Sequence, residues 1–166
     1  MNQVCSAVSI DSFTPETGHN VGVDVGTTFL NANVIGTAYA ALGVRIDPNE
    51  YNASVAIDTV SALAATADSF ILQVRHNPTV AGTAPTWTAV PDSDIDYSIG
   101  DTTNTVTGGD ILYSAYVQKN GDAIGDINGL LKLGTDLDGA PDEQWIVIIP
   151  LGANLDVYTS INLKEV

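Results

Sequence analysis

Apolar residues recur at every second position in several short segments of this chain, and this period of two constrains the fold most. Ile95, Tyr97 and Ile99 alternate with aspartate and serine, and the residues from Leu155 to Leu163 alternate in the same way. Successive side chains of a β-strand point to opposite faces, whereas a helix repeats its apolar positions every three or four residues. No long stretch has helical spacing with capping residues. The sequence therefore predicts strands throughout.

The other predicted strands come from the same alternation or from unbroken apolar runs. Phe70, Leu72 and Val74 should share one face of a strand, with Gln73 and Arg75 on the other. The apolar run at 145–149 predicts a central strand covered on both faces, and the alanine-rich segment at 61–67 is interpreted as strand. Strands are expected at 28–35, 39–46, 55–61, 70–75, 86–88, 95–99, 111–117, 145–149 and 155–163.

Short strands joined by Gly, Pro, Asn and Asp turns predict an all-β protein. We expect a jelly-roll-like β-sandwich formed by residues 27–166, because this architecture suits the chain length of 166 residues and the uneven loops. Residues 1–26 mix few apolar residues with Gly, Ser and Thr, which predicts an extended N-terminal arm or, alternatively, a frayed terminus. Within it, residues 21–25 alternate and could pair as a strand. Asn120-Gly121 predicts a hairpin turn.

Charge excludes several classes of function. The chain has 20 acidic and 5 basic residues, a net charge of −15, and only 15% charged residues. Five scattered basic residues are too few for a surface that neutralises nucleic-acid phosphates or for a polybasic membrane anchor. No apolar run reaches the ~20 residues of a membrane-spanning helix, and the N-terminal residues do not resemble a signal peptide. We therefore expect a soluble protein made in a cytoplasm, with neither nucleic acid nor membrane as partner.

No catalytic or cofactor site is predicted. Cys5 is the only cysteine and His19 and His76 are the only histidines, so a disulfide within the chain is impossible and no metal site is expected. Asp92, Asp94 and Asp96 share one face of a predicted strand and are interpreted as a solvated face. No serine or histidine lies in a recognisable catalytic motif. We expect a protein that is not an enzyme and has no cofactor.

The pattern D-x-[DN]-G occurs twice, at residues 126–129 and 136–139. Asp and Asn tolerate the left-handed conformation beside a turn glycine, so both segments are predicted to be hairpin turns. Oxygen-rich loops can also bind calcium. Whether Asp136, Asp138 and Gly139 do so stays open.

Apolar residues lie on both faces of several predicted strands, and few charges are available to solvate an isolated monomer. Surfaces of this kind are usually covered by a symmetry mate or a larger assembly. The sequence therefore favours a structural building block.

One segment resembles a known family. Residues 70–83, FILQVRHNPTVAGT, are followed by Thr86-Trp87-Thr88 and Ser93. This resembles structural proteins of tailed bacteriophages, in which a strand leads into an N-P-T-[IV]-A-G-T loop and then a short aromatic strand. Pro78 would fix the backbone conformation at the start of the loop. Gly82 would permit a tight reversal of the chain, and Trp87 would provide a large buried anchor.

The resemblance implies a jelly-roll virion protein, often trimeric. The function it implies is that of a capsid decoration (cement) protein, which binds the major capsid protein on the outer surface of the virion and stabilises contacts between capsid subunits. We expect a homotrimer with Asn77, Pro78 and Trp87 as loop or subunit contacts. The implied capsid-binding residues of the arm are Val4, Val8, Ile10 and Phe13.

The alternative is a receptor- or carbohydrate-binding module of a phage fibre or tail. Such a module needs aromatic side chains exposed in loops. The candidates are Trp87, Tyr97, Tyr113 and Tyr158.

Overall fold

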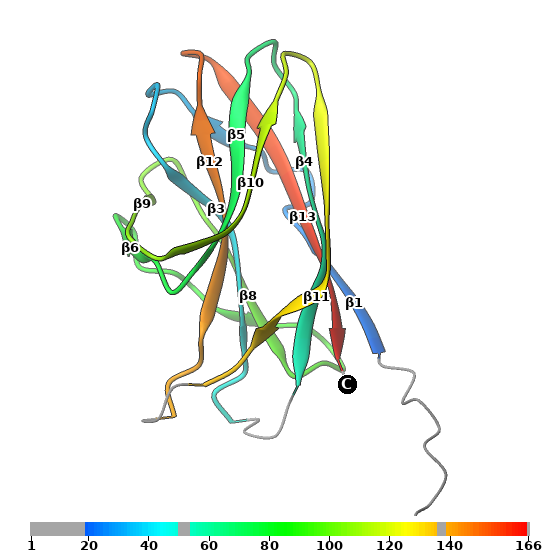
Figure 1. Ribbon diagram of the computed structural model, residues 1–166. Coiled ribbons are helices and arrows are strands. Elements are labelled where there is room, and N and C mark those ends of the chain that lie inside the picture. Colours follow the sequence, from blue (N-terminus) through cyan, green and yellow to red (C-terminus); the bar gives the residue numbers. More distant parts are fainter. Residues whose placement is uncertain (1–18, 50–53, 136–138, 166) are drawn as a thin grey trace, which may run out of the picture.

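The computed structural model describes residues 19–49, 54–135 and 139–165, and these ranges contain strands and turns but no helix (Figure 1). The strands are β1 (His19–Asp24), β2 (Leu30–Ala32), β3 (Tyr39–Ile46), β4 (Val55–Ala64), β5 (Phe70–His76), β6 (Thr79–Ala81), β7 (Thr88–Ala89), β8 (Ile95–Ile99), β9 (Thr105–Thr107), β10 (Asp110–Val117), β11 (Asp122–Leu133), β12 (Glu143–Pro150) and β13 (Leu155–Glu165). The expected all-β fold is confirmed.

The strands form two antiparallel sheets, which we name by a central strand. The β4 sheet has the order β1-β13-β4-β11, and the β12 sheet has the order β10-β5-β12-β3-β8-β7. If β1, β3, β4, β5, β10, β11, β12 and β13 are numbered one to eight along the chain, the sheets read 1-8-3-6 and 2-7-4-5. This is the connectivity of a jelly roll, in which the chain passes repeatedly between two facing sheets. The predicted jelly-roll-like sandwich is present.

The main core lies between the sheets. Phe70, Leu72 and Val74 are buried there, as the alternation predicted, in the same core cluster as Val157 and Ile161 of β13 in the opposite sheet. At ~25 cal/mol per Å² of apolar surface removed from water, these alternating rows supply the main stabilisation of the sandwich. Strand β12 is buried on both faces, also as predicted: its residues from Trp145 to Ile148 are almost completely inaccessible.

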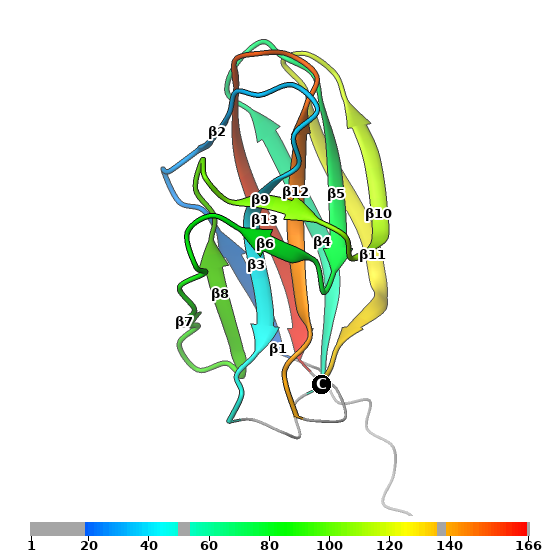
Figure 2. The ribbon, with the colours of Figure 1, turned by 90° about the vertical axis from the view of Figure 1, so that its left-hand side faces the viewer.

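The second cover of β12 comes from the long connection between β5 and β10. Strands β6 and β9 of this connection pair with each other and cross the outer face of the β12 sheet, and we call them the flap (Figure 2). A small second core forms beneath, from Trp145, Val147 and Val106, with Val80 and Trp87 packed against it. At the reversal after β6, Gly82 has φ +95°, and a Cβ there would lie 2.2 Å from the carbonyl oxygen of Thr103. The predicted tight reversal at Gly82 is confirmed.

Some local predictions were wrong. The first expected strand at 28–35 is limited to β2, and residues beyond Ala32 form a loop. The Asn120-Gly121 turn exists, but it joins β10 and β11, which belong to opposite sheets and so do not form a paired hairpin. Residues 126–129 are not a turn either. They lie inside β11, where Asp126 pairs with Thr59 and Leu131 with Ile57, so the segment bulges out of register.

The N-terminal and calcium predictions fall partly outside the described residues. β1 begins at His19 and pairs with β13 along its whole length, so the alternation at 21–25 does form part of the sandwich. Residues 1–18, with Val4, Val8, Ile10 and Phe13, lie outside the described ranges, and so do Asp136 and Asp138. Gly139 has φ +83°, a conformation typical of a turn glycine.

Two truncations should show how much β1 contributes to the stability of the sandwich, apart from the residues that precede it. Deletion of residues 1–26 removes β1 with its buried Val21 and Val23, whereas deletion of residues 1–18 leaves both in place. We expect the 1–26 deletion to have a free energy of unfolding lower by at least ~3 kcal/mol than the 1–18 deletion. Urea unfolding followed by tryptophan fluorescence measures the difference. Equal stabilities would show that β1 contributes nothing to the sandwich.

Candidate interaction surface

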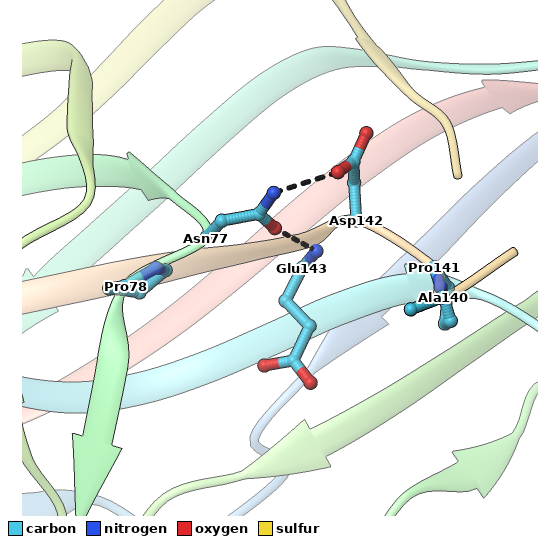
Figure 3. A pocket seen from close by; sticks show the side chains of 6 residues that line it. All are labelled: Asn77, Pro78, Ala140, Pro141, Asp142 and Glu143. Atoms are coloured by element: carbon cyan, nitrogen blue, oxygen red, sulfur yellow. Dashed lines mark hydrogen bonds between the residues drawn. The ribbon is translucent and has the colours of Figure 1, made fainter. Parts of the chain in front are cut away.

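Asn77 forms the junction between β5 and the flap (Figure 3). Its backbone has φ +45°, which asparagine tolerates better than most residues. Its side-chain Oδ1 accepts a hydrogen bond from the backbone N–H of Glu143 at 2.7 Å, and its Nδ2 donates to Oδ1 of Asp142 at 2.7 Å. Its own N–H donates to the carbonyl of Glu143 at 2.8 Å. Asn77 thus binds the end of β5 to the start of β12.

A shallow hollow adjoins this junction. It is lined by Asn77, Pro78, Ala140, Pro141, Asp142 and Glu143 (Figure 3). His76 Nε2 lies 3.8 Å from Asp142 Oδ1. Within the part of the chain that the structure describes, no three His, Cys, Asp or Glu side chains are grouped as metal ligands would be. Asn77 and Pro78 therefore direct the chain into the flap, and their role as subunit contacts stays a prediction.

Trp87 anchors the same connection further along. The Arg45 guanidinium lies 4.4 Å from the centre of the Trp87 ring, and Trp87 meets Trp145 edge to face at 5.6 Å. Arg45 also donates two hydrogen bonds to Oδ2 of Asp96, at 2.9 and 3.1 Å. Cation–π contact and a charged hydrogen-bonded pair thus join β3, β8 and the segment before β7. The expectation of Trp87 as an anchor agrees with this geometry, although its ring is partly exposed.

The interpretation of Asp92, Asp94 and Asp96 as one solvated face was wrong. Asp96 is only 7% exposed, because its side chain points to the outer face of the β12 sheet, where Arg45 covers it. Asp92 lies in a turn with φ +58°. Only the identity of the partner residue on β3 could have revealed the pair, and a single sequence does not show which strands are neighbours.

The aromatic residues proposed for glycan binding are all partly buried. Tyr97 and Tyr113 pack against the main core, and Tyr158 contacts Phe29 edge to face at 5.9 Å. The most exposed aromatic residue described is Tyr116, at 78%, which the sequence analysis did not single out. The alternation of β10 contained the signal, since it placed Tyr113 and Val117 on one face and hence Tyr116 on the other.

Tyr116 belongs to an apolar row on the outer face of the β12 sheet. It pairs with Ile71 of β5, which pairs with Ile149 of β12. Leu151, 45% exposed, follows the end of β12. In the loop after β2, Ile35 is 59% exposed and precedes Gly36, whose N–H donates to the carbonyl of Pro150. We call these five residues the apolar stripe: Tyr116, Ile71, Ile149, Leu151 and Ile35. Tyr116 and Ile149 are close to the last residues of β10 and β12, and Ile71 is close to the first residue of β5. Figure 2 shows that the flap crosses the sheet below this end of the three strands.

A smaller apolar pair occupies the outer face of the β4 sheet. Leu63 of β4 and Ile124 of β11 are 52% and 71% exposed, beside a hollow lined by residues 61–63 and 122–124. Ile111 of β10 is also exposed, at 54%, although regular alternation would place it on the same face as Tyr113. The register of β10 shifts between these two residues, and this shift turns Ile111 away from the core.

The surface is acidic, and in the described ranges few carboxylates meet a cation. Arg45 forms an ion pair with Asp96, and the His76 ring lies 3.8 Å from Asp142. Several carboxylates instead accept hydrogen bonds from neutral donors, and Asp101 is one of them. The side-chain and backbone N–H and O–H groups of Thr103 lower the pKa of Asp101, because they bind its charged form.

No protein-family model matches the chain, and no curated protein matches it either. Among the described residues, no helix is long and apolar enough to cross a membrane. A jelly-roll sandwich serves many unrelated functions, so the fold alone does not assign one. The surface must carry the functional argument.

Removal of one partner should show how much the Arg45–Asp96 pair contributes to the free energy of unfolding. Asp96→Ala leaves the half-buried guanidinium without its carboxylate, and we expect the free energy of unfolding to fall by about 3 kcal/mol. The double variant Arg45→Met, Asp96→Leu should recover most of that loss, since it leaves no unpaired charge. Asp122→Ala, an exposed residue on β11, serves as control and should change stability by less than about 0.5 kcal/mol. Urea unfolding measures all three.

Asp101 should make stability depend on pH in the acid range. Its pKa in the folded protein is lower than the ordinary value of 3.8, so its contribution is present above that value and is lost as pH falls toward the folded pKa. Thr103→Val removes the largest cause of the shift. We expect the variant to lose less stability than the wild type between pH 6 and pH 3, measured by urea unfolding. Parallel losses would contradict the assignment.

Proposed function

We propose that this chain is a virion structural protein, a capsid decoration (cement) protein that binds the outer shell and stabilises contacts between major capsid subunits. The observation that carries the proposal is the apolar stripe. In a chain with 15% charged residues, Tyr116, Leu151 and Ile35 are exposed to water. Tyr116 also adjoins the partly buried Ile71 and Ile149 on the outer face of the β12 sheet. Apolar surface of this kind is typical of proteins that bind a further subunit.

The segment that resembles phage structural proteins supports the proposal through its place in the fold. Residues 70–83 form β5, the Asn77 junction, β6 and the reversal at Gly82, and Trp87 follows as the anchor. The segment therefore builds the cover over the outer face of β12. The residues that resemble phage structural proteins therefore help to build the sandwich and are not limited to its surface.

The mechanism would be burial of surface across subunit junctions. At ~25 cal/mol per Å², a few hundred Å² of apolar area in each copy provides several kcal/mol before the entropy of association is subtracted. A shell could then open only by losing these contacts in every copy. The proposed trimer would carry three such surfaces, and Val4, Val8, Ile10 and Phe13 would add arm contacts with neighbouring capsid subunits.

The alternative, a glycan- or receptor-binding module of a fibre, has less support. Trp87, Tyr97, Tyr113 and Tyr158 are engaged in packing within the described structure rather than exposed in loops. Specific binding on a glycan array would favour this alternative.

Cosedimentation tests the proposed function. The full-length protein is mixed with emptied, expanded heads of the virus that encodes it, and bound protein is quantified after pelleting. We expect saturable binding with a fixed number of copies per head, and heads with bound protein should withstand higher temperature before opening. Protein that stays in the supernatant at every concentration would contradict the proposal. The mass of the free protein in solution tests the predicted trimer separately.

A further inference from the structure

We propose that the apolar stripe is the capsid-contacting surface, and that it binds an apolar patch bordered by Lys and Arg on the shell protein rather than a second copy of this chain. This inference rests on the proposed function and specifies the surface and the chemistry of the partner. It follows from three properties of the stripe: continuity, rigidity and the absence of charge.

The stripe is continuous because the pairing of three strands aligns it. Tyr116, Ile71 and Ile149 occupy neighbouring positions on β10, β5 and β12, and all three alternate with residues of the main core. Lower on the same face, the flap buries Trp145 and Val147, and the partly buried Ile149 packs against this cluster at its edge. The described residues thus cover one part of this apolar face and leave the part with Tyr116 open (Figure 2).

The stripe is preformed. Leu151 donates its backbone N–H to the carbonyl of Ser69 at 2.9 Å, and Gly36 donates its N–H to the carbonyl of Pro150 at 2.9 Å. These bonds attach both loops of the stripe to the ends of β5 and β12. A surface that needs no ordering on binding loses little conformational entropy, so more of its apolar burial contributes to affinity.

The stripe is uncharged within an acidic protein. The next outward-facing row on the same strands is Ser114, Gln73 and Val147, which also carries no charge. Gln73 is buried, and its Oε1 accepts a hydrogen bond from Arg75 Nε, while Arg75 Nη1 donates to the carbonyl of Gly108. These hydrogen bonds of the guanidinium therefore go to groups outside the stripe. The stripe therefore offers apolar contact without an ion pair of its own.

The net charge of −15 distinguishes between a second copy of this chain and a basic partner surface as the occupant of the stripe. A second copy docked on the stripe would bring the same large negative charge against a surface that has no cation to offset the repulsion, so the proposed trimer would have to use another surface. A partner patch bordered by basic side chains would be attracted by the net negative charge of the chain, since Arg45–Asp96 is the one Lys or Arg salt bridge among the described residues. Charge complementarity therefore favours a basic partner surface.

The experiment compares two matched double variants in the full-length protein. Tyr116→Thr with Leu151→Ser removes two exposed apolar side chains from the stripe, and Leu63→Thr with Ile124→Thr removes two from the outer face of the β4 sheet. All four side chains are exposed, so thermal unfolding followed by circular dichroism should show both variants folded. Binding to emptied, expanded heads is measured by cosedimentation at 50 and 500 mM NaCl, and the mass of the free protein by sedimentation velocity at both salts.

We expect the stripe variant to bind at least tenfold more weakly than the wild type and the β4-sheet variant to bind normally. Wild-type binding should weaken several-fold at 500 mM NaCl, because salt screens attraction between unlike charges. Normal binding by the stripe variant would overturn the inference and leave the proposed function intact. A stripe variant that lowers the mass of the free protein, with association strengthened by salt, would show that a second copy occupies the stripe and would also overturn it. No binding by the wild type would overturn the proposed function, and this inference with it.

Discussion

The burial of β12 on both faces is the constraint on which the rest of this structure depends. Its residues from Trp145 to Ile148 have almost no contact with water, although only one face of the strand can point into the space between two sheets. The other face needs a second cover, and the flap with Trp87 provides it. Gly43 makes room beside it on β3, since a Cβ there would lie 2.6 Å from the Trp145 ring.

The position of the flap determines which apolar residues become surface. Asn77, in a left-handed conformation, ends β5 and is hydrogen-bonded to the start of β12, so the connection leaves the sheet at a defined place. From there the flap crosses Trp145 and Val147 but does not reach Tyr116. A single junction thus divides one apolar sheet face into a buried part and an exposed part. The exposed part is the surface on which the proposed function depends.

Period-two alternation predicted the strands that have one inner and one outer face. β5, β8 and β13 lie where the alternation placed them, because a strand packed against a core on one face repeats its environment every two residues. β3 and β12 lie where apolar runs predicted strands. The pattern failed where this repeat is interrupted. β11 was not expected because glycine and a bulge disturb its register beside Thr59, and Ile111 turned outward at a similar shift in β10. The burial of Asp96 depends on Arg45, a residue far away in the sequence, and local patterns contain no information on that contact.

By itself the sequence determined the all-β class, the positions of most strands and the presence of apolar residues on both faces of β12, because these follow from local side-chain periodicity. The tertiary structure alone decided which strands are neighbours, that Asp96 is paired and buried, and which apolar residues remain exposed. The physical reason is that a side chain on a sheet face is buried by segments that are distant from it in the sequence. Burial of Trp145 and exposure of Tyr116 result from where the connection between β5 and β10 crosses the sheet, and that path is set by contacts between strands rather than by the residues on either side of Trp145 or Tyr116.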